Sequence, residues 1–222
     1  MPTPTILKEM IAVIRTEQAR RASLANKDPN LTDDPDAPFF DPDTPFINEL
    51  CLMVLVALRH QVERELIRLA ARVRDEGKEI SRDRYRANLD KVRDNLRKKD
   101  GWKTTIEATL EPDKCRDYEE IEALRLLANS YKHHPSMEPD KQLLHKLKLP
   151  TNVRYAWMPE SDSLREALAT FIGLNKEATY CDVAEQFIDV ASSFLKEVRT
   201  RRKSQLSPIS RRVSLKSSDA AR

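Results

Sequence analysis

Residues 124–134 read LRLLANSYKHH, and this stretch guides the interpretation of the whole chain. Apolar residues recur here at spacings of three and four, which places them on one face of an α-helix. This apolar stripe consists of Ile121, Leu124, Leu127, Ala128 and Tyr131. A polar stripe lies beside it at the same spacing and consists of Glu122, Arg125, Asn129 and His133. The stretch therefore predicts an amphipathic helix with polar groups along the edge of its packed face.

The polar stripe has two interpretations. An Arg offers a fixed charge and a fork of N–H donors, and a His exchanges protons near neutral pH, so these residue types suit a phosphodiester. The same residues also suit a structural role, because buried or half-buried polar groups link a helix to its neighbours by hydrogen bonds. The Lys-His-His run at residues 132–134 is in addition favourable at the negative end of a helix dipole. The residues alone leave both interpretations open.

The composition favours helices over strands. The chain has 222 residues, enough for one large or two small domains with a sizeable core. It contains only 3 Gly, with 40% hydrophobic and 34% charged residues, and strong helix formers such as Leu, Ala, Glu, Lys and Arg are abundant. The sequence therefore predicts an all-α protein.

Three long helices are expected to form an antiparallel bundle, at about residues 45–75, 113–133 and 179–202. The first of them opens with Thr44 and Pro45, a hydroxyl cap followed by a proline in the first turn. Its first half is apolar on nearly all sides. Such a helix must be covered by other helices or by a partner subunit.

The chain is expected to contain four segments. Residues 1–27 form an N-terminal amphipathic helix, and residues 28–44 form a linker, because closely spaced prolines prevent regular structure. Residues 45–203 form the helical bundle. Residues 204–222 are basic and lack aromatic residues, which predicts a disordered tail. From residue 196 to 222 nine basic residues face two acidic ones, a net charge of +7 that a phosphate backbone would attract.

The cysteine and histidine pattern bears on the compartment and on metals. Cys51, Cys115 and Cys181 are odd in number and far apart, which argues against a disulfide framework and favours a reducing compartment. The His and Cys residues lack the spacing of a zinc site, so neither a metal nor another cofactor is expected. The most apolar run, residues 50–58, is much shorter than the roughly 20 residues that span a bilayer. We therefore expect a soluble cytoplasmic protein that does not enter the membrane.

Residues 124–133 fit the pattern Leu-Arg-x-Leu-Ala-Asn-x-x-Lys-His within a helical chain, and this resembles the HEPN superfamily, above all its bacterial members without an assigned role. The resemblance covers roughly residues 44–202. It implies a homodimer, and a metal-independent endoribonuclease of the kind found in toxin–antitoxin, phage-defence and CRISPR-associated systems. It also implies RNA as the substrate and an antitoxin-like protein as a partner.

The resemblance carries three catalytic roles to this sequence. His133 would transfer a proton from a ribose 2′-hydroxyl or to the leaving oxygen. Arg125 would stabilise the phosphorane, and Asn129 would orient the phosphate. A 2′-hydroxyl nucleophile restricts this chemistry to RNA.

The spacing of Arg125 and His133 departs from the nuclease pattern, because seven residues separate them and the pattern has fewer. Positions eight apart on one helix lie about 12 Å apart along its axis. One phosphate could therefore contact both only where two subunits share a site. The alternative is a non-catalytic helical binding or dimerisation module of a conflict or regulatory system.

Overall fold

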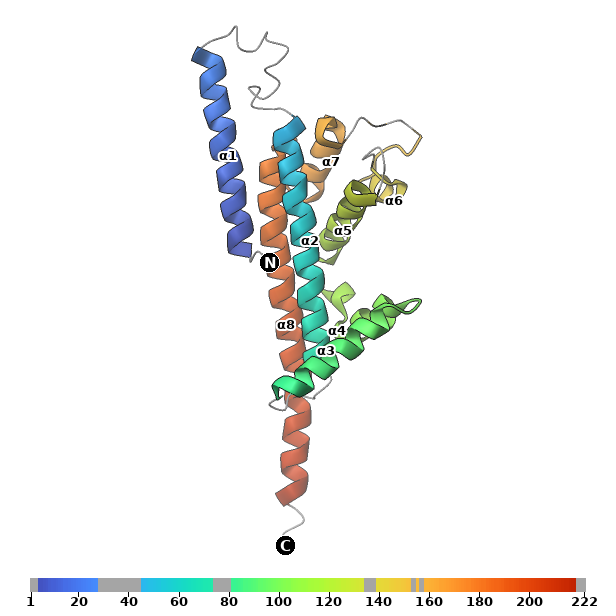
Figure 1. Ribbon diagram of the computed structural model, residues 1–222. Helices are drawn as coiled ribbons and strands as arrows, with labels where there is room; N and C mark the ends of the chain where they lie inside the picture. Colours follow the sequence, from blue (N-terminus) through green and yellow to red (C-terminus); the bar gives the residue numbers. More distant parts are fainter. Residues whose placement is uncertain are drawn as a thin grey trace. The chain divides into compact units, whose positions relative to one another are not determined.

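The structure is a computed structural model that describes the backbone of residues 4–27, 45–73, 81–133, 139–152, 155 and 158–218. Side chains are described for residues 5–23, 46–73, 81–132, 139–152, 155 and 158–202. These parts of the chain contain eight α-helices and no strand (Figure 1). The prediction of an all-α fold is confirmed. The chain divides into two compact units, which we describe one at a time.

Unit 1 comprises residues 1–61 and 119–191. Its elements are α1 (Pro4–Lys27), nearly all of α5 (Tyr118–His133), α6 (Lys141–Lys146), the 3-10 turn η4 (Met158–Glu160), α7 (Asp162–Phe171) and the first parts of α2 (Pro45–Val73) and α8 (Tyr180–Ser218). Every one of these elements contributes to an apolar core. Its most deeply buried members include Leu7, Ile47, Leu55, Leu124, Leu143, Leu164 and Phe187.

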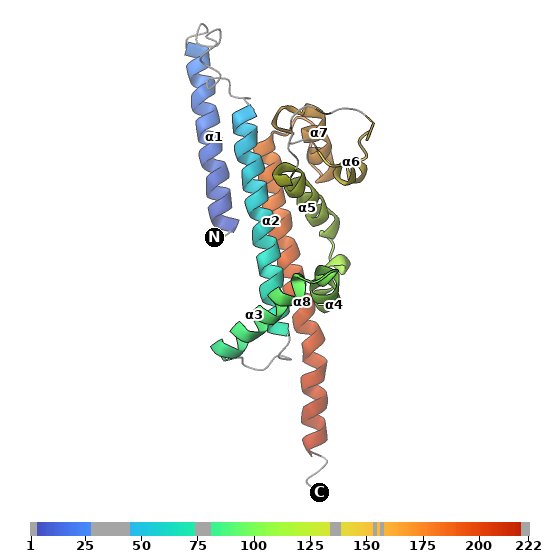
Figure 2. The ribbon, with the colours of Figure 1, turned by 45° about the vertical axis from the view of Figure 1, so that its right-hand side comes forward.

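The helices α2 and α8 begin at the same end of unit 1. Asn48 of α2 donates a hydrogen bond to the carbonyl oxygen of Pro159 at 2.7 Å, and the hydroxyl of Tyr180 donates to the neighbouring carbonyl of Met158 at 2.8 Å. From there the two helices lie side by side and run in the same direction (Figures 1 and 2). This differs from the antiparallel arrangement predicted for them. The long segment between the two helices permits either direction, since only short connections force neighbouring helices to be antiparallel.

The helix α1, predicted over residues 1–27, packs along α8 in the opposite direction. The Lys8 ammonium lies 2.5 Å from Asp189, whereas Arg15, further along α1, lies 2.7 Å from Asp182 and 2.7 Å from Glu185. Exposed ion pairs of this kind contribute about 0.2–1 kcal/mol each. Burial of an aliphatic side chain contributes about 1.5–3 kcal/mol, so packing holds α1 more than charge does. The buried side chains of this face are Leu7, Ile11 and Ile14.

Unit 2 comprises residues 62–118 and 192–222. It contains the later parts of α2 and α8 together with α3 (Arg82–Leu96), the π-helix η2 (Lys103–Glu107), α4 (Ala108–Leu110) and the 3-10 turn η3 (Pro112–Lys114). Gly101 lies directly against the last turn of α3, where an added Cβ would approach the Asn95 carbonyl oxygen to 2.2 Å. Only glycine fits there, which explains how the chain turns back sharply after α3.

Two helix boundaries differ from those predicted. The helix expected at 113–133 begins at Tyr118, because Pro112–Lys114 form a 3-10 turn and Cys115 is extended (φ −85°, ψ 146°). The helix expected to end at about residue 202 continues to Ser218 as α8, through most of the tail predicted as disordered. A polar composition shows that a segment cannot build a core, but it does not prevent a packed helix from continuing. The predicted linker 28–44 and residues 219–222 lie outside the described residues.

Candidate functional site

The described part of the polar stripe, Glu122, Arg125 and Asn129, together with the neighbouring Lys132, forms a surface that we call the α5 flank. Lys132 is exposed, and the other three residues are half-buried. On the packed side of the same helix Leu124 and Leu127 are only 0% and 1% exposed. The α5 flank is therefore accessible to a ligand and is not sealed within the core.

Arg125 makes an ion pair within the flank. Its Nε and Nη2 atoms each lie 2.9 Å from Oε2 of Glu122, three residues earlier on the helix. The Arg125 side chain is still 38% exposed. Exposed helical pairs of this spacing contribute about 0.3–0.5 kcal/mol, so a phosphate could compete with Glu122 for the guanidinium. Arg125 is thus paired with Glu122 without being buried by it.

An imidazole lies at the flank, and it comes from α2. The Lys132 ammonium is 2.9 Å from Nε2 of His60, whereas Nη1 of Arg59 is 3.4 Å from Nδ1 of the same ring. A neutral imidazole has one donor and one acceptor nitrogen. Lys132 and Arg59 are both donors, so only one of the two contacts can be a hydrogen bond to a neutral ring, and the Lys132 contact is the shorter. Sequence reasoning assigned no role to His60, because His60 and Lys132 are 72 positions apart and only the packing of α2 against α5 brings them together.

The three residues predicted as catalytic are only partly placed. Arg125 and Asn129 lie on the α5 flank, as the helical spacing predicts. His133 is the last residue of α5, and its side chain lies outside the described residues. The association of Arg125 with His133 therefore stays a prediction.

Tyr131, next to Lys132 on α5, provides a second link between α5 and α2. Its hydroxyl donates a hydrogen bond to Oε1 of Glu49 at 3.0 Å. Burial and the neighbouring Glu49 carboxylate raise the pKa of Tyr131 to about 12, since both disfavour a phenolate. Tyr131 is therefore neutral at physiological pH and holds the helix that carries the flank.

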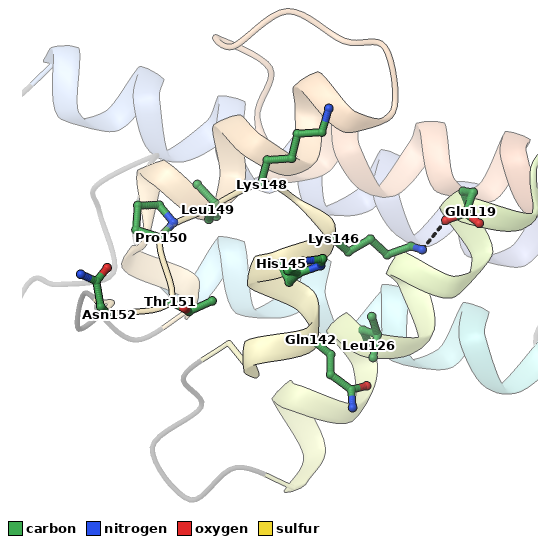
Figure 3. A pocket seen from close by; sticks show the side chains of 10 residues that line it. All are labelled: Glu119, Leu126, Gln142, His145, Lys146, Lys148, Leu149, Pro150, Thr151 and Asn152. Carbon is green, nitrogen blue, oxygen red and sulfur yellow. Dashed lines mark hydrogen bonds and ion pairs between the residues drawn. The ribbon is translucent and has the colours of Figure 1, made fainter.

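An open pocket of about 1000 Å³ lies between α5, α6 and the segment that follows α6 (Figure 3). Its wall on α5 includes Leu126 and Glu119, which lie on faces of the helix next to the flank. Lys146 extends from α6 to an ion pair with Glu119 (Figure 3). His145 and Lys148 add further basic groups, so the pocket combines a basic rim with an apolar wall. Such a lining suits an anionic ligand that also has an apolar surface, as a nucleotide has.

The described part of the chain shows neither a group of metal ligands nor a membrane-spanning helix. No three His, Cys, Asp or Glu side chains there are grouped as metal ligands would be. None of the described helices combines the length and the apolar character needed to cross a bilayer.

Comparisons of the chain with models of known protein families, with curated protein sequences and with solved structures gave no match. The HEPN resemblance accordingly depends on the residues of α5 that carry it, and it stays a prediction.

Proposed function

We propose that the chain is a HEPN-like cytoplasmic protein that binds RNA at the α5 flank and cleaves it without a metal ion. One observation carries the proposal: the half-exposed Arg125 and Asn129 share a helix flank with Lys132, whose ammonium contacts His60. Two fixed positive charges, an amide and an imidazole are the groups that phosphodiester cleavage requires.

Arg125 and Lys132 bind different phosphates of the strand. Residues seven apart on a helix are separated by about 10 Å along its axis, too far for contact with one phosphate. Arg125 offers a planar fork for two phosphate oxygens, and Lys132 acts as a point charge for the next phosphate. The basic rim of the adjacent pocket, with His145 and Lys148, continues this path for the strand.

The reaction is an attack of a ribose 2′-hydroxyl on the adjacent phosphorus. An imidazole removes the hydroxyl proton, the 5′-oxygen leaves and takes up a proton, and the products are a 2′,3′-cyclic phosphate and a 5′-hydroxyl. Arg125 stabilises the negative phosphorane, and Asn129 orients the phosphate. His133 and His60 are the two imidazoles that compete for the proton-transfer role.

The proposal includes a homodimer, because a shared site would overcome the long spacing of Arg125 and His133. A separate surface for association of two copies is available on α1, on the far side of α2 and α8 from α5 (Figures 1 and 2), where Ile6, Met10 and Val13 are 43%, 42% and 69% exposed. Exposed apolar groups clustered in this way are typical of interaction surfaces. Sedimentation should give the mass of a dimer for the native chain and of a monomer for Val13→Lys. An antitoxin-like protein on this surface would instead leave the isolated chain monomeric.

A non-catalytic binding module is the second candidate function. The ion pair between Arg125 and Glu122 favours it, because the guanidinium already has a partner within its own helix. In that case the flank would contribute to binding or to stability without cleaving RNA.

The deciding experiment incubates the purified protein with structured and unstructured RNA in EDTA. The variants are Arg125→Ala, His60→Ala and His133→Ala. We expect Arg125→Ala and one of the two His variants to lower the cleavage rate by at least about 100-fold, the usual contribution of a catalytic proton-transfer or oxyanion group. The variant with the larger loss identifies the proton-transfer residue.

Arg93→Ala is the matched control. Arg93 of α3 is paired with Asp90, three residues earlier on its helix, and Nη1 of Arg93 lies 3.7 Å from Oδ1 of Asp90. Arg125 and Glu122 have the same spacing in the sequence. Arg93→Ala should change neither the rate of RNA cleavage nor the affinity for RNA. The chain would be a non-catalytic binding module if the native protein cleaved no RNA and if Arg125→Ala, but not Arg93→Ala, bound RNA more weakly. Neither cleavage nor binding would exclude an RNA-directed function.

A further inference from the structure

Two buried thiols meet between α2 and α8. The Sγ atoms of Cys51 and Cys181 are 3.0 Å apart, although the residues are 130 positions apart in the chain. Both are free cysteines, with exposures of only 0% and 2%. They lie within unit 1, near the ends at which α2 and α8 begin. A contact this close between unbonded sulfur atoms is the geometry from which a disulfide forms with little movement.

We propose that Cys51 and Cys181 are a redox-sensitive pair that forms a reversible disulfide between α2 and α8 when the protein meets a peroxide. A disulfide has an S–S length of about 2.05 Å, so closing the gap requires an approach of roughly 1 Å. Small rotations of the two short side chains supply such a displacement. The proposal is independent of any activity at the α5 flank.

The two sulfur atoms have different roles. Cys181 lies in the first turn of α8, where the positive end of the helix dipole favours a thiolate. The contact with Cys51 and the positive charge of Arg15 lower the pKa of Cys181, against the opposing effects of burial and of the Asp182 and Glu185 carboxylates. The same contact, together with burial, raises the pKa of Cys51. Cys181 is therefore the nucleophile, and Cys51 is the thiol that resolves the intermediate.

The oxidation takes two steps. The Cys181 thiolate attacks one oxygen of hydrogen peroxide, the O–O bond breaks, and a sulfenic acid and a hydroxide ion form. The Cys51 sulfur then attacks the sulfenic sulfur, an S–S bond forms, and the S–O bond breaks. The hydroxyl of the sulfenic acid and the thiol proton leave as water, and the hydroxide from the first step takes up a solvent proton. In sum two thiols are oxidised and one peroxide is reduced to two waters, and a dithiol reverses the change.

Cys115 provides an internal control. It is also a free, buried cysteine, but it belongs to unit 2 and has no thiol partner among the described residues. Burial raises the pKa of Cys115, and no second thiol lies against it among the described residues. A peroxide should therefore link Cys51 to Cys181 and form no disulfide within the chain at Cys115.

The test treats the native full-length protein with hydrogen peroxide and measures its intact mass, the linked peptides and its Tm. We expect a loss of two hydrogen atoms and a peptide that links Cys51 to Cys181. We also expect a Tm higher by roughly 5 °C, because a cross-link over so long a loop restricts the unfolded chain. Dithiothreitol should reverse all three changes.

Variants assign the roles of the two sulfur atoms. Oxidation of Cys51→Ser should stop at a sulfenic acid that dimedone traps. Cys181→Ser should form neither the sulfenic acid nor the disulfide. Cys115→Ser should behave as the native protein does. Circular dichroism shows whether each variant is folded, and peptide mapping of the native chain needs no variant. The proposal is overturned if the folded native protein forms no linkage under conditions that cross-link the urea-unfolded chain. A linkage that involves Cys115 or joins two chains would overturn it equally.

Discussion

The two sides of α5 have the same sequence spacing and opposite physical roles. Leu124 and Leu127 repeat at a helical interval and are almost fully buried, whereas Arg125 and Asn129 repeat at a similar interval and remain partly exposed. The apolar side gains free energy from each atom it removes from water. The polar side gains little from its own ion pair, which is partly exposed to solvent. Periodicity identifies both stripes equally well, but burial decides which one governs stability.

The sharpest test of this difference is Leu127→Ala. Leu127 is 1% exposed, so its truncation removes buried contacts and leaves a cavity. We expect a loss of about 2–5 kcal/mol in the free energy of unfolding, measured by urea denaturation. Lys132→Ala is the control from the exposed flank and should change that free energy by less than about 0.5 kcal/mol. Equal losses would show that the flank is part of the core.

A smaller loss is expected for Tyr131→Phe. The substitution keeps the ring and removes the hydroxyl that donates to Glu49. A net hydrogen bond of this kind contributes about 0.5–1.5 kcal/mol, and Glu49 is half-buried, so water replaces part of the interaction. Urea denaturation at neutral pH should therefore place this variant between Leu127→Ala and Lys132→Ala. A larger loss than that of Leu127→Ala would contradict this order.

The same tyrosine predicts a dependence on alkaline pH. Its pKa is about 12 in the folded protein, and it is about 10 in an unfolded chain. Above pH 10 the unfolded state binds fewer protons than the folded state, so stability is complete below pH 10 and falls as the pH rises toward 12. Burial also raises the pKa of Tyr180, which acts in the same direction. The slope of stability against pH between 10 and 12 should be shallower in Tyr131→Phe than in the native protein, and an unchanged slope would contradict the assignment.

The smallest effect on stability is expected at the flank itself. Glu122→Gln removes the charge that pairs with Arg125 and should lower the free energy of unfolding by less than about 0.5 kcal/mol. Under the proposed function the same change frees the guanidinium and removes a repulsive carboxylate, so the affinity for RNA should rise. A filter-binding titration at fixed salt concentration measures the affinity of each protein for RNA. Weaker RNA binding by Glu122→Gln would indicate that Glu122 positions Arg125 for the phosphate.

The positions of the long helices were predictable from the sequence, and their ends were less so. The periodic apolar residues of α2 and α5 and the prolines at their borders predict where a helix forms. The extended conformation of Cys115 and the continuation of α8 beyond residue 202 have no comparable local signal. The conformation of Cys115 depends on how the neighbouring segments pack. The continuation of α8 depends on a helix that is already formed before the polar segment begins.

The candidate site divides in the same way. Arg125 and Asn129 were identified because they share one helix, and local spacing suffices to place them together. His60 could not be identified from the sequence, because its contact with Lys132 requires α2 and α5 to meet. Nor do the scattered positions of Cys51 and Cys181 indicate that their sulfur atoms touch.

The sequence by itself determined the all-α class, the amphipathic character of α5 and the residue types along its flank, because helical periodicity and propensity act over a few neighbouring residues. Tertiary structure alone decided that α2 and α8 run in the same direction, that an imidazole from α2 reaches the flank and that two distant thiols come into contact. These features arise from burial of apolar surface between segments far apart in the chain, and that free energy depends on the packed arrangement and not on local sequence.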